Sequence, residues 1–258
     1  MLLPARASAA PTPALPDVST VMRRMKAALE PSRPSLRDLE IVLHDSDGAE
    51  TRWTAREASK PTPQGARIAI VMTSPDEVAG AAFLIVEQAN KPDVQWDYLP
   101  AVRRVRKIVP VGAFHPVLGT DFTYGDLGFV HLEDRSVRLL GVETLAGGSQ
   151  AYRVEERPQN SWYYARIIDL IATDTLLPVR REFFTPAGDL WKVETFESVT
   201  VIDGVATPLV IRMDDRLQGG STELHAMHVR YDVDIPEAVF EPDGLKRLLH
   251  QPVWSAGP

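Results

Sequence analysis

Two hydrophobic periodicities follow one another along this chain. Near the N-terminus apolar residues recur at helical spacing, opposite the basic residues Arg23, Arg24 and Lys26. Asp17 or Ser19 can cap such a helix, and the prolines that follow it end it. The pattern predicts one amphipathic helix whose apolar stripe packs on a sheet and is formed by Val18, Val21, Met22, Met25 and Leu29.

Beyond residue 35 the period changes to two, which is typical of half-buried strands. Apolar and polar residues alternate in segments separated by short turns rich in Gly, Pro, Asp and Ser. Such turns leave no room for the crossover helices that parallel strands need. The prediction is a mainly β protein: a single curved antiparallel sheet, a half β-barrel of about eleven or twelve strands, whose concave apolar face is covered by a few helices.

The segment from Trp96 to Leu127 interrupts this alternation. Trp96 and Tyr98 stand at strand spacing and point to one side, so they are expected to form a cavity wall. Further along, residues 115–127 are too apolar for an ordinary loop, which makes this segment and the N-terminal helix candidate lids over the concave face. Phe122, Tyr124 and Leu127 are the lid residues expected to trade places with a bound apolar ligand.

If side chains of the protein fill the concave face, it is only a β core, whereas a loose lid would leave a cavity large enough for a lipid. Both readings stay open at this point. The residues predicted to line such a cavity or its lid are Met22, Met25, Trp53, Ile70, Met72, Phe83, Ile85, Trp96, Tyr98, Leu118, Phe122, Tyr124 and Leu127.

A basic run lies between the aromatic pair and the lid segment and consists of Arg103, Arg104, Arg106 and Lys107. It has three interpretations. The charges can protect an edge strand from aggregation, they can dock an acidic partner or lipid headgroups, or they can pair internally with Asp121 or Asp126 beneath the lid.

The composition restricts the class of function. The chain has 258 residues, a net charge of −7 and no cysteine. The acidic balance argues against nucleic acid as a partner, and the absence of cysteine excludes disulfides, thiolate catalysis and lipid attachment to an N-terminal cysteine. No apolar run approaches the ~18 residues that span a bilayer.

The ends of the chain carry weaker signals. Residues 1–16 are rich in Ala and Pro, and Ala7-Ser8-Ala9 has the pattern of a signal-peptidase site after an apolar stretch shorter than usual. We expect a disordered remnant of an export signal or linker over 1–16, one domain over 17–250 and a flexible tail over 251–258. A disordered cytoplasmic N-terminus is the alternative.

Catalytic and metal-binding signals are weak. His225 and His228 have a spacing that binds metal on a helix, but on a strand these side chains project to opposite faces. His115, Asp121 and Asp126, with His131 and Glu133, could form an acid–base pair, yet no nucleophile motif or phosphate-binding loop accompanies them. We therefore expect no enzyme activity, metal or cofactor.

Between Ser74 and Leu127 the motifs SPDEVAGAAFLI, QWDYLPAVRRVRKI and LGTDFTYGDL follow in order, and RIIDLIATDTLLPVRREFFTPAGDLWK and VATPLVIRM come later. Over about residues 36–248 the chain thereby resembles the outer-membrane lipoprotein-sorting proteins, relatives of the periplasmic carrier LolA. The glycine at position 125 departs from that pattern, which commonly has an acidic residue there.

The resemblance implies a periplasmic carrier, or chaperone, that binds acyl chains of lipoproteins or other envelope lipids and shuttles them toward the outer membrane. Its expected partners are the lipid cargo, an inner-membrane transporter and an outer-membrane acceptor, and the expected state is a monomer. A lipid-sensing or protein-interaction domain of the cell envelope is the alternative function, and a hydrolase ranks behind it.

Overall fold

The computed structural model describes residues 15–89, 91–127, 135–159 and 163–255. Thirteen strands of this part of the chain form one antiparallel sheet. They are β1 (Ser35–His44), β2 (Glu50–Thr62), β3 (Gly65–Ser74), β4 (Ala82–Gln88), β5 (Lys91–Leu99), β6 (Arg104–Ile108), β7 (Arg135–Thr144), β8 (Gln150–Pro158), β9 (Arg166–Ala172), β10 (Pro178–Phe184), β11 (Leu190–Ile202), β12 (Val205–Asp215) and β13 (Ser221–Tyr231).

The sheet is built from two meanders that meet at its centre. Its strand order is β6-β5-β4-β3-β2-β1-β13-β12-β11-β10-β9-β8-β7, so the last strand pairs with the first. The predicted mainly β, antiparallel fold is confirmed. The strand count is higher than the eleven or twelve expected, and the basic run contains one edge strand. That strand is only the five-residue β6, since Arg103 has a positive φ in the turn before it.

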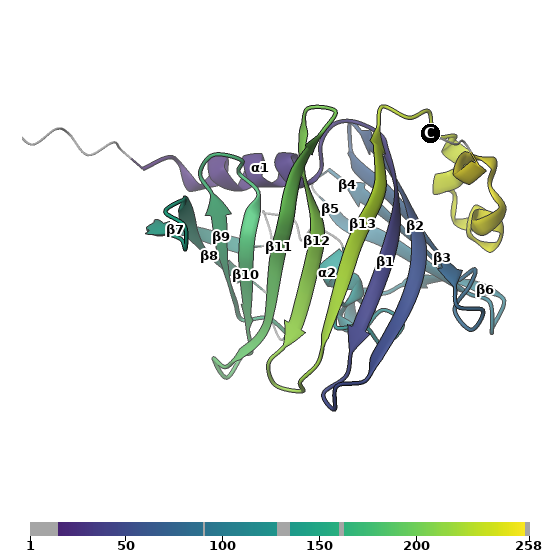
Figure 1. The fold of residues 1–258 in the computed structure, drawn as a ribbon, viewed down its shortest axis with the longest axis horizontal. Coiled ribbons are helices and arrows are strands. Elements are labelled where there is room, and N and C mark those ends of the chain that lie inside the picture. The colour runs from purple at the N-terminus through teal and green to yellow at the C-terminus, as the bar shows by residue number, and fades with distance from the viewer. Residues whose placement is uncertain (1–14, 90, 128–134, 160–162, 256–258) are drawn as a thin grey trace, which may run out of the picture.

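The sheet curves around α1 (Val18–Leu29) and the one-turn helix α2 (Tyr124–Leu127), which lie on its inner face (Figure 1). The Asp17 side chain caps α1 by accepting a hydrogen bond from the Thr20 backbone N–H at 2.9 Å. The predicted apolar stripe is buried at Val21, Met22 and Met25, which pack against Val154 and Ile171. Tertiary packing of this face thus holds the predicted helix in place.

The outer face of the sheet is covered at one end by the C-terminal segment (Figure 1). It forms three 3₁₀ helices: η3 (Glu237–Phe240), η4 (Pro242–His250) and η5 (Pro252–Ser255). The expected flexible tail is therefore ordered as far as residue 255. Val253 is buried in the outer-face core, and the Trp254 indole donates a hydrogen bond to the Leu248 carbonyl at 2.6 Å. Residues 1–14 and 256–258, part of the two predicted terminal segments, lie outside the described residues.

Candidate cavity on the inner face of the sheet

A cavity of about 200 Å³ lies between the inner face of the sheet and residues 115–127. Its apolar walls come from β1 to β4 on one side and from β11 to β13 on the other. Seven of the predicted residues line it: Trp53, Ile70, Met72, Phe83, Leu118, Phe122 and Leu127. Binding sites for small molecules commonly measure ~300–1,000 Å³, so this cavity is small for a whole acyl chain in the conformation described.

Residues 115–127, hereafter the lid segment, close the cavity as a small folded loop. Pro116 and Thr123 form an isolated antiparallel bridge, and the Val117 N–H donates to the Phe122 carbonyl at 2.9 Å. The Phe122 ring is only 3% exposed, in a cluster with Tyr164, Phe183 and Met213. The lid segment therefore fills part of the inner face with its own aromatic side chain.

Polar contacts fasten the lid segment to the sheet. Thr222 donates a side-chain hydrogen bond to the Asp121 carboxylate at 2.7 Å and accepts one from the Asp121 N–H at 3.0 Å. The Lys192 ammonium donates to the Asp121 carbonyl at 2.6 Å. Asp126 accepts hydrogen bonds from the Tyr164 hydroxyl and the Thr123 N–H. The carboxylates considered for acid–base chemistry thus hold the lid segment, while His131 and Glu133 lie outside the described residues.

Tyr124 belongs to the lid segment but does not line the cavity. Its hydroxyl donates to the Asp97 carboxylate of β5 at 3.0 Å, and its carbonyl accepts from the Gln95 side chain at 2.9 Å. Its ring lies against Phe83, with centroids 6.0 Å apart. Tyr124 therefore anchors the end of the lid segment to the sheet.

Five other predicted residues do not line this cavity. Met22 and Met25 line a neighbouring cavity of about 80 Å³ beneath α1. Trp96 and Tyr98 pack instead on the outer face with the C-terminal segment, so their assignment to the cavity wall is wrong. Trp96 and Tyr98 do share one face of β5, as the alternation predicts. The side chains of β5 that point inward are those of Gln95 and Asp97, which contact Tyr124. Ile85 is buried in register with Ile68, which lines the cavity.

The cavity is polar at one end. The paired residues of β1 and β2 that line the cavity are polar at this end, as in Ser35–Ser59 and Arg37–Glu57. Further along the strands they are apolar, as in Ile41–Trp53. The polar pairs lie toward the C-terminal end of α1, where Glu30 and Arg33 also line the wall. This polar end was not predicted, although Arg37 and Glu57 lie on the same face of their strands as residues predicted to face inward.

A buried charge cluster lies on β7 to β11 between the two cavities. Arg181 donates to Asp169 at 2.8 Å and forms an ion pair with Glu194 at 3.5 Å, while Arg135 pairs with Glu156. Burial raises the pKa of Glu194 to about 7, and burial together with Glu156 raises the pKa of Asp169. Because Arg181 and Glu194 line both cavities, their pair forms the partition between them.

The basic run is divided between two environments. Arg106 forms two hydrogen bonds with the fully buried Asp97, at 3.0 and 2.6 Å, and Lys107 lies over the Trp96 ring. The internal partner is thus Asp97, not Asp121 or Asp126. Arg103 and Arg104 are exposed at the sheet edge, where they make no ion pair with a described residue.

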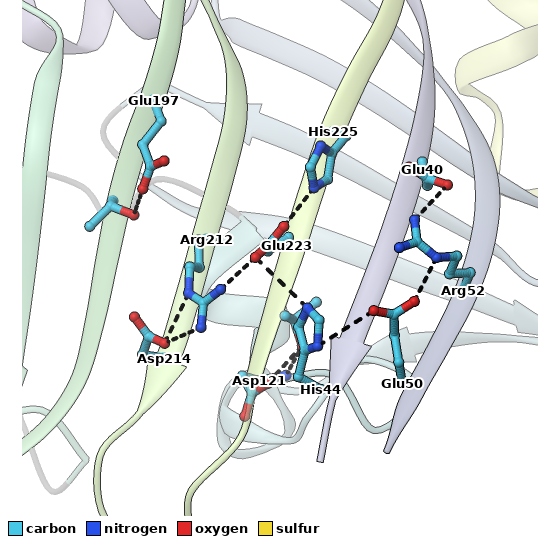
Figure 2. Close-up of polar contacts among 12 residues, drawn as sticks. Glu40, His44, Glu50, Arg52, Asp121, Glu197, Arg212, Asp214, Glu223 and His225 are labelled. Carbon is cyan, nitrogen blue, oxygen red and sulfur yellow. Dashed lines mark hydrogen bonds and ion pairs between the residues drawn. The ribbon is translucent and has the colours of Figure 1, made fainter. Parts of the chain in front are cut away.

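A second polar region occupies the outer face of β1, β2, β12 and β13 (Figure 2). Glu223 contacts the His225 imidazole at 2.7 Å and pairs with Arg212, and His44 lies 3.8 Å from it. His228 instead contacts Asp38. Within the described ranges no group of three or more His, Cys, Asp or Glu residues has the geometry to hold a metal ion.

Among the helices in the described ranges, none combines the length and the hydrophobicity that a membrane-spanning helix requires. No curated protein matches the sequence. A family model described only as "-like: Uncharacterized protein" matches residues 65–247, most of the chain.

Solved structures give a more informative comparison. A domain from Vibrio parahaemolyticus, described as a candidate outer membrane lipoprotein-sorting protein domain, is 26% identical, covers 88% of this chain and 97% of its own, and superposes with a TM-score of 0.82. A DUF1329 family protein from Desulfovibrio piger is 24% identical, with 88% and 96% covered and a TM-score of 0.80.

A LolA superfamily protein from Nitrosomonas europaea shares the fold at 20% identity, with 87% and 97% covered and a TM-score of 0.68. The three similarities span almost the whole length of each relative and include the half-barrel sheet. The chain belongs to a LolA-like family.

Proposed function

We propose that this protein is a periplasmic carrier that binds acyl chains of lipoproteins or other envelope lipids in the inner-face cavity and shuttles them toward the outer membrane. The observation that carries the proposal is the apolar cavity beneath a lid segment that fills part of the same face with Phe122. Family membership supports the same role.

The energetics fit a carrier whose lid competes with its cargo. Burial of a dozen methylenes at ~0.8 kcal/mol each gives at most about 10 kcal/mol, which corresponds to a Kd on the order of tens of nanomolar. Opening of the lid segment costs part of this energy, because Phe122 leaves its cluster with Tyr164, Phe183 and Met213. A closing lid therefore helps to release the cargo.

Arg103 and Arg104 suit docking on lipid headgroups or on an acidic partner, such as an inner-membrane transporter or an outer-membrane acceptor. They are exposed at the edge of the sheet, where a partner can reach them. Charge reversal of both residues should weaken transfer of lipid between donor and acceptor membranes without reducing lipid affinity. Unchanged transfer would rule out this docking role.

The carrier proposal is tested by extraction of the purified protein and identification of copurified lipid by mass spectrometry. A second measurement is titration of the delipidated protein with single-chain amphiphiles of increasing length. Each added methylene should raise affinity up to about fourfold until the cavity is full. If no lipid copurifies and affinity does not depend on chain length, the protein is not a lipid carrier.

A further inference from the structure

The inner-face cavity has an apolar end under the lid segment and a polar end near α1. From the Arg37–Glu57 pair to the Ile41–Trp53 pair the strands advance four residues, or roughly 13 Å. An amphiphile bound in the cavity therefore has one favourable orientation, with its tail toward Phe122 and Leu127 and its head beside Arg37. Such an orientation presupposes the proposed lipid-binding function.

The charged groups at the polar end already have partners. Arg37 Nε lies 3.1 Å from a carboxylate oxygen of Glu57, and both side chains are only 17% exposed. Arg33 forms two hydrogen bonds with Asp232 and one with the Asp203 carbonyl. An anionic head would meet Glu57 beside Arg37, and a cationic head would meet the arginines. Each would add an uncompensated charge to a partly desolvated site.

Two buried polar atoms at this end nevertheless lack a hydrogen bond. They are Arg37 Nε, whose N–H is not aimed at Glu57, and Glu30 Oε1. Both residues line the cavity. Buried polar groups are normally hydrogen-bonded, so one unused donor and one unused acceptor in the lining of the same cavity point to a complementary ligand group. A hydroxyl group has this chemistry because it can accept from Arg37 and donate to Glu30.

We propose that the cavity selects single-chain amphiphiles with an uncharged, hydroxyl-bearing head, which lies at the Arg37–Glu57 pair and Glu30 while the tail extends beneath the lid segment. Monoacylglycerols and long-chain alcohols belong to this class. The Arg37–Glu57 ion pair is the selective element because it neutralises the arginine that would otherwise attract a carboxylate head.

The test compares amphiphiles that share a lauryl chain and differ in the head. Monolaurin, dodecanol, laurate and a dodecylammonium salt are titrated below their micelle concentrations, at pH 7.5, against a fluorescent apolar probe in the full chain. Monolaurin and dodecanol should bind at least about tenfold more tightly than either charged amphiphile, a difference of about 1.4 kcal/mol. Equal or tighter binding of laurate would overturn the proposal.

Glu57→Gln provides the decisive variant because it leaves Arg37 without its carboxylate. Laurate affinity should then rise by about tenfold, and the preference for monolaurin should shrink or vanish. Glu50→Gln is the matched control, since Glu50 pairs with Arg52 on the outer face, remote from the cavity. A head preference that is the same in Glu57→Gln and the wild type would contradict the proposal.

Arg37→Gln keeps the experiment decisive if Glu57→Gln does not fold. It should weaken monolaurin binding without any gain for laurate, and monolaurin affinity equal to that of the wild type would contradict the proposed head site. Different results would refute the head preference and the lipid-carrier function. Binding of all four amphiphiles with equal affinity refutes only the head preference, whereas binding of none refutes lipid carriage as well.

Discussion

Phe122 belongs both to the protein core and to the cavity wall. Its 3% exposure and its packing against Phe183 and Met213 are those of a core residue, so Phe122→Ala should lower the free energy of unfolding by about 3–5 kcal/mol. The same truncation removes the ring that competes with cargo. We therefore expect an acyl probe to bind more tightly and to exchange more slowly in this variant.

Phe240→Ala is the control for this prediction. Phe240 is equally buried, but it packs on the outer face with the C-terminal segment, away from the cavity. Its truncation should cost similar stability, as measured by urea denaturation, and should leave probe affinity and exchange as in the wild type. If both variants bind and release the probe like the wild type, Phe122 is only a core residue and the lid hypothesis is wrong.

Individual residues also show which parts of the cavity could be predicted from the sequence. The phase of alternation correctly put Trp53, Ile70, Met72 and Phe83 on one inner face, because apolar residues alternate regularly there. It failed for Trp96, because the buried residues of its strand are the polar Gln95 and Asp97, which lie on the opposite face. Alternation assigns residues to two faces of a strand, but it does not show which face points into the curved sheet. Here the C-terminal segment covers the face that carries Trp96 and Tyr98, so that face is the outer one. That contact joins parts of the chain too distant for a local pattern to reveal.

At the scale of elements, α1 is held to the sheet by a small buried ionic cluster. Lys26 donates to Glu87 of β4 and lies 3.5 Å from Glu30. Burial, with a further contribution from Glu87, raises the pKa of Glu30 to about 8, and burial raises the pKa of Asp93 nearby to about 7. Three carboxyl groups around one ammonium group make the attachment of α1 dependent on pH.

The sign of that dependence follows from proton binding. A carboxyl group whose pKa is higher in the folded than in the unfolded state binds its proton more tightly when folded, so its contribution to stability is lost as pH rises between the two values. The free energy of unfolding should therefore fall between about pH 5 and pH 8. A single such group gives a slope of at most ~1.4 kcal/mol per pH unit.

Glu30→Gln should flatten this slope because the amide does not titrate, and stability above pH 8 should exceed that of the wild type. Part of the dependence of stability on pH should remain, because Asp93 still titrates with a raised pKa. Urea denaturation at intervals from pH 5 to pH 9 measures the effect, with Glu50→Gln on the outer face as the control. A slope as steep in Glu30→Gln as in the wild type would show that Glu30 is already ionised in the folded protein.

The elements themselves were largely predictable, because α1 and the long strands carry strong, uninterrupted periodicities. The sheet edges and the lid segment were less so. β6 has only five residues, and α2 is a single turn whose position depends on the hydrogen bonds of Tyr124 with Asp97 and Gln95 of the distant strand β5. Such short elements form through tertiary contacts, and local propensity alone does not define them.

For the whole molecule, the carrier proposal requires the lid segment to move relative to the sheet. The cavity of about 200 Å³ is too small for a long acyl chain while Phe122 occupies its place. A covalent link between lid segment and sheet should therefore block long-chain ligands selectively. The chain contains no cysteine, so two introduced cysteines can form only one intramolecular disulfide.

Asp121 and Thr222 are the positions of choice because their side chains touch at 2.7 Å across the boundary between lid segment and sheet. In Asp121→Cys/Thr222→Cys, the oxidised protein should lose at least about tenfold in affinity for a long-chain amphiphile, and reduction should restore the affinity of the dithiol form. The reduced form serves as the internal control for the lost hydrogen bond. Equal binding by the two forms would mean that cargo enters without displacement of the lid segment, so that the cavity would have to enlarge by movement of α1 instead.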